Sequence, residues 1–83
     1  MKIHVRYFAS LREALGPGEI VELPDIATLG RLRADLAARG GRYAEVLDRG
    51  RAVRCALNQV MSDEAAVVRD GAEVAFFPPV TGG

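Results

Sequence analysis

The chain has 83 residues, 11 basic and 11 acidic side chains, a formal net charge of zero, and 49% hydrophobic residues. This length allows one domain with a modest core, and the neutral, apolar-rich composition disfavours both intrinsic disorder and a nucleic-acid partner. No apolar run approaches the roughly 20 residues of a membrane span, and a strand pattern begins at once where a signal peptide would stand, so we expect a cytoplasmic protein without membrane association.

Residues 2–8 alternate in polarity and predict a first strand. Ile3 and Val5 mark its core face, which leaves Phe8 pointing away from the core near the end of the strand. His4, the only histidine, is interpreted as an ordinary exposed strand residue.

A short helix is expected over residues 9–15, with Ser10 as its N-cap. The sequence Gly16-Pro17-Gly18 ends this helix and turns the chain into a second strand over residues 19–23. The two strands therefore form a hairpin-like pair with a helical excursion between them.

The principal helix is predicted from Thr28, its N-cap, to about Arg39. Its apolar stripe is expected to pack across the sheet, and Gly40-Gly41 supplies a left-handed exit. Arginines elsewhere on this helix are interpreted as a solvated face. The stripe consists of Leu29, Leu32 and Leu36, and the arginines are Arg31, Arg33 and Arg39.

The second half of the chain predicts shorter elements. Residues 43–47 suggest one more helical turn, residues 52–59 a third strand that ends in a turn at Asn58-Gln59, and residues 65–68 a short strand. Cys55 falls on the apolar face of the third strand, so we expect a buried thiol and not a nucleophile. As the only cysteine, beside a single histidine, it offers neither a disulfide nor a metal-ligand pattern.

Arg69-Asp70-Gly71 is a turn signal that leads into the last strand, residues 73–77. Val74 and Phe76 share one face of this strand, and Phe77 lies on the other. The last apolar side chain before the tail is therefore expected to point away from the core.

The chain ends in a tail of unusual composition, Pro78-Pro79-Val80-Thr81-Gly82-Gly83. Because the two prolines lack N–H donors and fix φ, the sheet cannot continue through them and the chain leaves it extended. Because glycine has no Cβ, the last two residues can enter a channel too narrow for side chains. We therefore predict a domain over residues 1–77 and a flexible tail over residues 78–83 that inserts into a partner.

The predicted reactive group is the terminal carboxylate of Gly83. It is ionised at neutral pH and is a poor acyl electrophile as it stands. Adenylation would convert it into an acyl phosphate anhydride that a persulfide or thiolate can attack. The sequence shows no catalytic base paired with a nucleophile and no phosphate-cradling loop, so we expect no active site of its own.

The octapeptide from Phe76 to Gly83 resembles the C-terminus of the small subunits of molybdopterin synthase, a family of ubiquitin-like β-grasp sulfur carriers. Three further stretches resemble the same family, so that the resemblance covers nearly the full chain. They are Tyr7-Phe8-Ala9 leading into Leu11-Arg12-Glu13, Ala56-Leu57-Asn58-Gln59, and the segment from Asp70 to Phe77.

This resemblance implies an α+β, β-grasp (ubiquitin-like) fold with a mixed sheet of about four to five strands packed on one main helix. In such a fold the first and last strands are parallel neighbours at the centre of the sheet. Phe8 and Phe77 can then form one exposed apolar patch, which Met61 can extend. A patch of this kind beside the tail is interpreted as a partner-docking surface.

The resemblance also implies a function in molybdenum cofactor biosynthesis. An adenylating enzyme would use ATP to activate Gly83, and a sulfur donor protein would convert the acyl adenylate into a thiocarboxylate. Gly83 would then deliver sulfur in a large catalytic subunit to a cyclic pyranopterin, forming the dithiolene of molybdopterin. The chain would bind no cofactor and no metal, would not be an enzyme on its own, and would work in a heterotetrameric complex.

Three alternatives stay open from the sequence. The carrier could serve thiamine or tRNA thiolation, although the residues before Gly82 favour molybdopterin. The chain could instead be a ubiquitin-like modifier that joins Gly83 to target lysines, with Lys2 as its own only lysine. Finally, it could be a β-grasp interaction module with an inert tail, in which case deleting Gly83 would leave its function intact.

Overall fold

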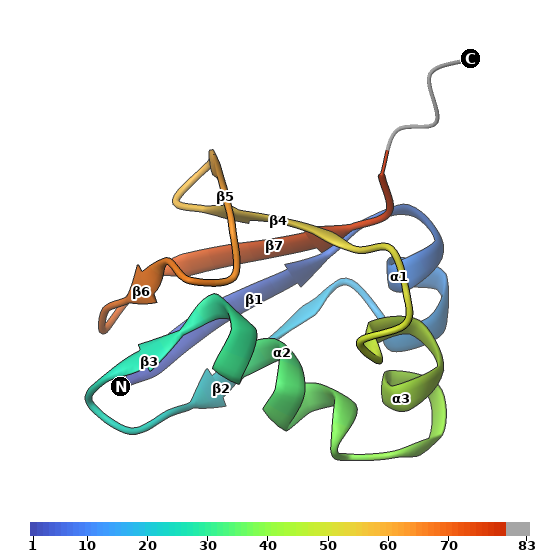
Figure 1. Ribbon diagram of the computed structural model, residues 1–83, viewed down its shortest axis with the longest axis horizontal. Coiled ribbons are helices and arrows are strands. Elements are labelled where there is room, and N and C mark those ends of the chain that lie inside the picture. The colour runs from blue at the N-terminus through green and yellow to red at the C-terminus, as the bar shows by residue number, and fades with distance from the viewer. Residues whose placement is uncertain (80–83) are drawn as a thin grey trace.

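The structure, a computed structural model, describes residues 1–79, so the predictions for Val80, Thr81, Gly82 and Gly83 lie outside the described residues. Figure 1 shows the arrangement of the elements. In chain order they are β1 (Lys2–Tyr7), α1 (Ala9–Leu15), β2 (Gly18–Glu22), β3 (Ala27–Thr28), α2 (Leu29–Ala37), α3 (Gly41–Leu47), β4 (Arg54–Leu57), β5 (Val60–Ser62), β6 (Val67–Val68) and β7 (Glu73–Phe77).

The main sheet is mixed and has five strands in the order β2-β1-β7-β4-β5. β1 and β7 run parallel at its centre, and the other neighbours are antiparallel. The prediction of a mixed sheet with parallel first and last strands is therefore confirmed. β3 and β6 form a separate two-stranded sheet.

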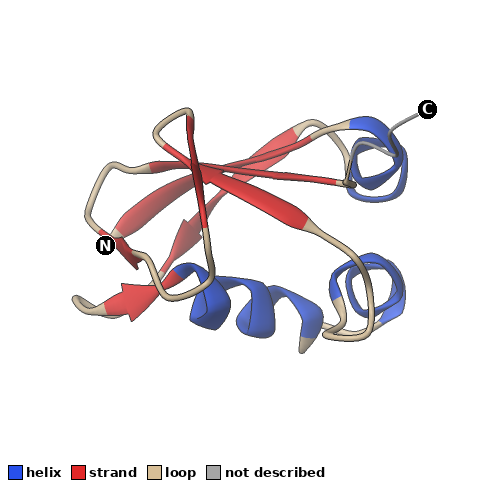
Figure 2. Ribbon diagram, turned by 45° about the horizontal axis from the view of Figure 1, so that its top comes forward, coloured by secondary structure: helices blue, strands red, loops and turns tan. Residues whose placement is uncertain are grey.

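The core lies between this sheet and the helices that cover one of its faces (Figure 2). Alternate residues of β1 and β7 point into it, and α2 packs its leucine stripe against them, because burying apolar surface is the main gain of folding. The most deeply buried side chains in this layer are Ile3, Val5, Tyr7, Leu29, Leu32, Leu36, Val74 and Phe76.

The start of α1 differs from the sequence prediction. Phe8, and not Ser10, is the N-cap residue, and it makes no side-chain cap hydrogen bond. The reason lies in the sheet, because the N–H of Phe8 donates to the carbonyl of Phe76 at 3.1 Å and so extends the β1–β7 pairing by one residue. The helix can therefore begin only at Ala9.

The principal helix begins as predicted, with the hydroxyl of Thr28 accepting a hydrogen bond from the N–H of Arg31 at 3.1 Å. It ends at Ala37, two residues earlier than expected. Gly40 and Gly41 follow with φ angles of 78° and 54°, the left-handed exit that glycine favours.

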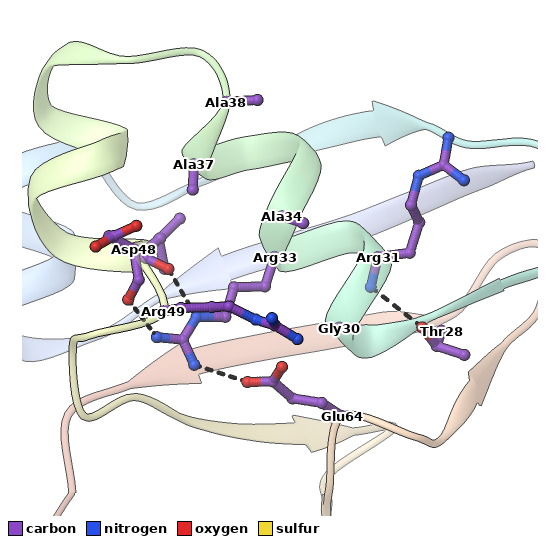
Figure 3. A pocket seen from close by; sticks show the side chains of 11 residues that line it. Thr28, Gly30, Arg31, Arg33, Ala34, Ala37, Ala38, Asp48, Arg49 and Glu64 are labelled. Atoms are coloured by element: carbon purple, nitrogen blue, oxygen red, sulfur yellow. Dashed lines mark hydrogen bonds and ion pairs between the residues drawn. The ribbon is translucent and has the colours of Figure 1, made fainter.

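Arg33 contradicts the interpretation of the helix arginines as a solvated face. Its side chain is buried, and its guanidinium donates to the carbonyls of Leu47, Asp48 and Arg51 and to a carboxylate oxygen of Glu64, each at 2.7 Å. Figure 3 shows the Arg33 side chain between Asp48 and Glu64. A periodic pattern cannot reveal this role, because the carbonyls come from the end of α3 and the loop after it, 14 to 18 residues away in the sequence.

Candidate docking face and tail exit

The tail leaves the sheet at the end of β7. Phe77 is the last paired residue, and Pro78 and Pro79 follow it partly buried. In Figure 1 this exit lies beside α1, at the opposite end of β1 from the N-terminus. The central strand of the fold therefore holds the segment that carries the predicted reactive group.

Phe8 and Phe77 lie side by side at this exit. The parallel register pairs Tyr7 with Phe76, so the next residues along both strands are neighbours on the face away from the helices. Phe8 is 39% exposed and Phe77 is partly buried. The structure thus brings together the two aromatic residues that the sequence placed outside the core.

Met61 reaches the same face from the far edge of the sheet. It pairs with Ala56, which pairs with Ala75 on β7, and all three side chains point away from the helices. Met61 is 56% exposed, Ala56 is buried, and Ala75 is partly buried, so the exposed apolar side chains of this face are chiefly Phe8 and Met61. We call the set Phe8, Ala56, Met61, Ala75 and Phe77 the open-face patch.

Two arginines that the sequence reasoning missed flank this patch. The Arg6 guanidinium carbon lies 5.7 Å from the centre of the Phe8 ring, and Arg54 is the cross-strand partner of Phe77. The alternation of side chains along β1 and β4 could have identified them, because it places both arginines on the same side of the sheet as the patch.

Cys55 takes no part in this face. Its side chain is buried, as predicted, and its thiol donates to the carbonyl of Ser62 at 3.3 Å. Burial raises the pKa of Cys55, so the reactive thiolate is disfavoured. The thiol is therefore a small core residue.

A polar cluster on the helix side joins β1, β2, α3 and the loop between α2 and α3. Glu19 accepts hydrogen bonds from the hydroxyls of Tyr7 and Tyr43 at 2.9 and 2.8 Å, and from the Arg39 guanidinium at 2.6 Å. Burial alone would raise the pKa of Glu19, but the hydrogen bonds from Arg39, Tyr43 and Tyr7 hold it below its ordinary value. Because each hydroxyl and the carboxylate have partners, the cluster acts as a clamp between β1, β2 and the helices.

A groove of about 660 Å³ runs along α2, lined among others by Arg31, Arg33, Ala34, Arg49 and Glu64 (Figure 3). The donors of Arg33 are used to hold the surrounding carbonyls, so they are not free for a ligand. Within residues 1–79, no three His, Cys, Asp or Glu side chains gather closely enough to hold a metal ion. None of the helices described has the length and apolarity to cross a membrane.

Comparison with known proteins gives consistent results over the full chain. The family model of the ThiS family matches residues 5–83. The molybdopterin synthase sulfur carrier subunits of Haemophilus influenzae and Escherichia coli are 40% and 41% identical to this chain, each over 98% of it and 99% of the relative.

Solved structures agree with these sequence matches. SAMP1 from Haloferax volcanii has a TM-score of 0.80 at 25% identity over the whole of both chains. The complex of subunits 1 and 2 of the molybdopterin-converting factor from Helicobacter pylori contains a chain with a TM-score of 0.70 at 27% identity, again over both full lengths. The fold is the ubiquitin-like β-grasp, and the chain belongs to the ThiS family, among the molybdopterin synthase sulfur carrier subunits.

Proposed function

We propose that this chain is the sulfur carrier subunit of molybdopterin synthase, with Gly83 as the residue that carries sulfur. The full-length identity to two carrier subunits of that enzyme is the observation that supports this function best. The exit of the tail from the central strand fits it, because a rigid β7 followed by two prolines holds the start of the tail in place.

In the proposed reaction the Gly83 carboxylate attacks the α-phosphate of ATP on an adenylating enzyme, and pyrophosphate leaves. A persulfide of a sulfur donor protein then attacks the acyl carbon and displaces AMP. A thiol reductant cleaves the resulting acyl disulfide and leaves a thiocarboxylate on Gly83. In the catalytic subunit this sulfur attacks a carbon of a cyclic pyranopterin and displaces an oxygen substituent. Water then hydrolyses the resulting thioester, which leaves the sulfur on the pterin and returns the Gly83 carboxylate, and two such transfers supply the two sulfurs of the dithiolene. The chain supplies the carboxylate and its placement, while acids, bases and pterin-binding residues belong to the partners.

The docking surface proposed for the large catalytic subunit is formed by Phe8, Met61 and Phe77, with residues 78–83 inserted into that partner. Two structural relatives were solved in complexes, the Helicobacter pylori converting factor and the Amycolatopsis orientalis BexX/CysO pair, the latter with a TM-score of 0.65. Both support a carrier that works bound to a second protein. We place this reaction in the cytoplasm.

A second candidate function is that of a ubiquitin-like modifier. The likeness to SAMP1, a small archaeal modifier protein, favours it. Both functions begin with activation of Gly83 and differ in the fate of the acyl group, which goes to sulfur in one and to a lysine amine in the other. The higher identity to the carrier subunits ranks sulfur transfer first.

The test is the intact mass of the protein purified from cells that contain its activating system, beside a variant that lacks Gly83. We expect the mass change of one oxygen replaced by sulfur in the full chain and no change in the variant. Both proteins should unfold at the same temperature, because the core lies within residues 3–76. An unmodified full chain, even after incubation with the activating enzyme, ATP and a sulfur source, would reject the carrier function, and adducts on lysines of other proteins would indicate the modifier.

A further inference from the structure

Two cations, Arg6 on β1 and Arg54 on β4, border the open-face patch. Across the sheet, Arg6 is the neighbour of Ala75, and Arg54 is the neighbour of Phe77. Both side chains therefore border the apolar surface directly, one on the β1 side and one on the β4 side. Any protein that covers Phe8, Phe77 and Met61 also covers or closely approaches both guanidinium groups.

Arg6 is held loosely and retains free donors. Its side chain is 57% exposed, and its only ion pair in the described part of the chain is a single contact with Glu73 at 3.4 Å. A guanidinium has five N–H donors, and this pair uses one of them weakly. The 5.7 Å contact with the Phe8 ring turns the cation toward the patch.

Arg54 is freer still. It is exposed, and within residues 1–79 no carboxylate lies within ion-pair distance of it. Its cross-strand partner Phe77 is the last residue of β7, so this cation stands next to the point where the tail leaves the sheet.

We infer that the partner surface which covers the open-face patch is apolar at its centre and carries a carboxylate opposite Arg6 and another opposite Arg54. A partner that is apolar over this whole area would partly dehydrate both cations without offering a counter-charge, which costs binding free energy. This inference rests on the proposed function, and the partner that it describes is the large catalytic subunit that receives the tail.

Charges at the rim of an interface act mainly on the rate of encounter and on its dependence on salt. Association of this chain with the catalytic subunit should therefore be fast at low ionic strength and slow down as salt screens the two arginines. The apolar residues of the patch, in contrast, should determine how long the complex lives.

The experiment compares three proteins: the unchanged chain, the double variant Arg6→Glu/Arg54→Glu, and Arg42→Glu/Arg49→Glu. The last pair of residues is exposed on α3 and the loop after it, on the helix side, and the substitution changes the net charge equally. The association rate constant and Kd with the catalytic subunit of the same organism are measured over a range of salt concentrations.

We expect the open-face variant to associate about tenfold more slowly or worse at low salt. Its association rate should rise as salt is added, because salt screens the repulsion between the new glutamates and the partner's carboxylates. The helix-side variant should keep the salt dependence of the unchanged chain. Because a glutamate at position 6 would face Glu73, the neutral variant Arg6→Gln/Arg54→Gln provides the same test without new repulsion, with a smaller loss in the same direction.

Equal losses in the two charge-reversed variants, or none in either, would overturn the inference while the proposed function stands, since the unchanged chain still binds. Failure of the unchanged chain to bind the catalytic subunit would reject the proposed function, and the inference with it. Urea unfolding of each variant checks that the fold is intact.

Discussion

Glu19 shows how one carboxylate can couple the stability of this fold to pH. Three hydrogen bonds favour its charged form and hold its pKa below the ordinary value of 4.5, against the opposing effect of burial. A carboxylate with a depressed pKa stabilises the fold fully above the ordinary pKa, and this contribution disappears as the pH falls through the folded-state value.

The variant Glu19→Gln tests this account. Near neutral pH we expect its free energy of unfolding to be about 1–3 kcal/mol lower than that of the unchanged chain, because charge-assisted hydrogen bonds become neutral ones. Urea unfolding at decreasing pH should show this gap narrowing below about pH 4.5, where Glu19 of the unchanged chain becomes protonated. A gap that stays constant to about pH 3 would show that the charge of Glu19 is not what the clamp uses.

Arg33 gives a second residue-scale prediction. Arg33→Ala removes the donors of three loop carbonyls, and an unpaired buried acceptor costs about 1–3 kcal/mol, so we expect a loss of at least about 2 kcal/mol. The control is Arg31→Ala, two positions earlier on the same helix. Its exposed pairing with Asp35 is worth about 0.5 kcal/mol or less. Equal losses in urea unfolding would contradict the role assigned to Arg33.

Residues such as these set the limit of sequence reasoning. The burial of Cys55 followed from its own strand, because alternation assigns a face locally. The roles of Arg33 and Glu19 depend on groups that lie between 12 and 31 residues away, and no local pattern encodes that distance. The same holds for Arg6 and Arg54, which become neighbours of the patch only through the order of the strands.

At the scale of elements, the sheet has one face under helices and one face open. On the open face, Phe8 and Met61 are exposed, and we predict that Phe8→Ser and Met61→Ser weaken binding to the catalytic subunit, each by about 1 kcal/mol or more. Their losses should appear mainly in the dissociation rate. Unfolding free energies should change little, because neither side chain is in the core.

The control for this prediction is Ile26→Ser. Ile26 is the most exposed large apolar side chain of the described residues, at 83%, and it directly precedes β3. β3 lies at the other end of the molecule from the point where the tail leaves β7 (Figure 1). It should bind the catalytic subunit as the unchanged chain does. If Ile26→Ser weakened binding as much as the other two, docking would not be confined to the open-face patch.

Long elements with a clear period were predictable, and short ones were not. β1, β7 and α2 were placed within one or two residues, since each has a strong apolar pattern of its own. β3 and β5 were missed, because two or three residues carry no usable period and their pairing depends on distant strands. The turn at Asn58-Gln59 was identified, and both residues adopt the positive φ angles of a tight hairpin.

At the scale of the whole molecule, the described residues form a domain that presents the open-face patch and includes Pro78 and Pro79, the first two residues of the tail. The fold followed from the sequence through the resemblance of the tail and three internal stretches to one family, and the comparisons confirm it. The roles of Gly83, of the tail and of the docking residues, and the boundary between domain and tail after residue 77, stay predictions for the experiments above.

The parallel pairing of β1 with β7 joins the first and the last strand of the chain at the centre of the sheet. His4 pairs with Glu73, which lies 69 residues later in the sequence, so β1 stays unpaired on this side until β7 is present. β7 is the last element in sequence order, so the centre of the sheet cannot form until residues 73–77 are available to pair with β1. A chain that ends before β7 therefore lacks the strand that joins β1 to β4 in the main sheet. Such a chain cannot assemble the open-face patch, because Ala75 and Phe77 both come from β7.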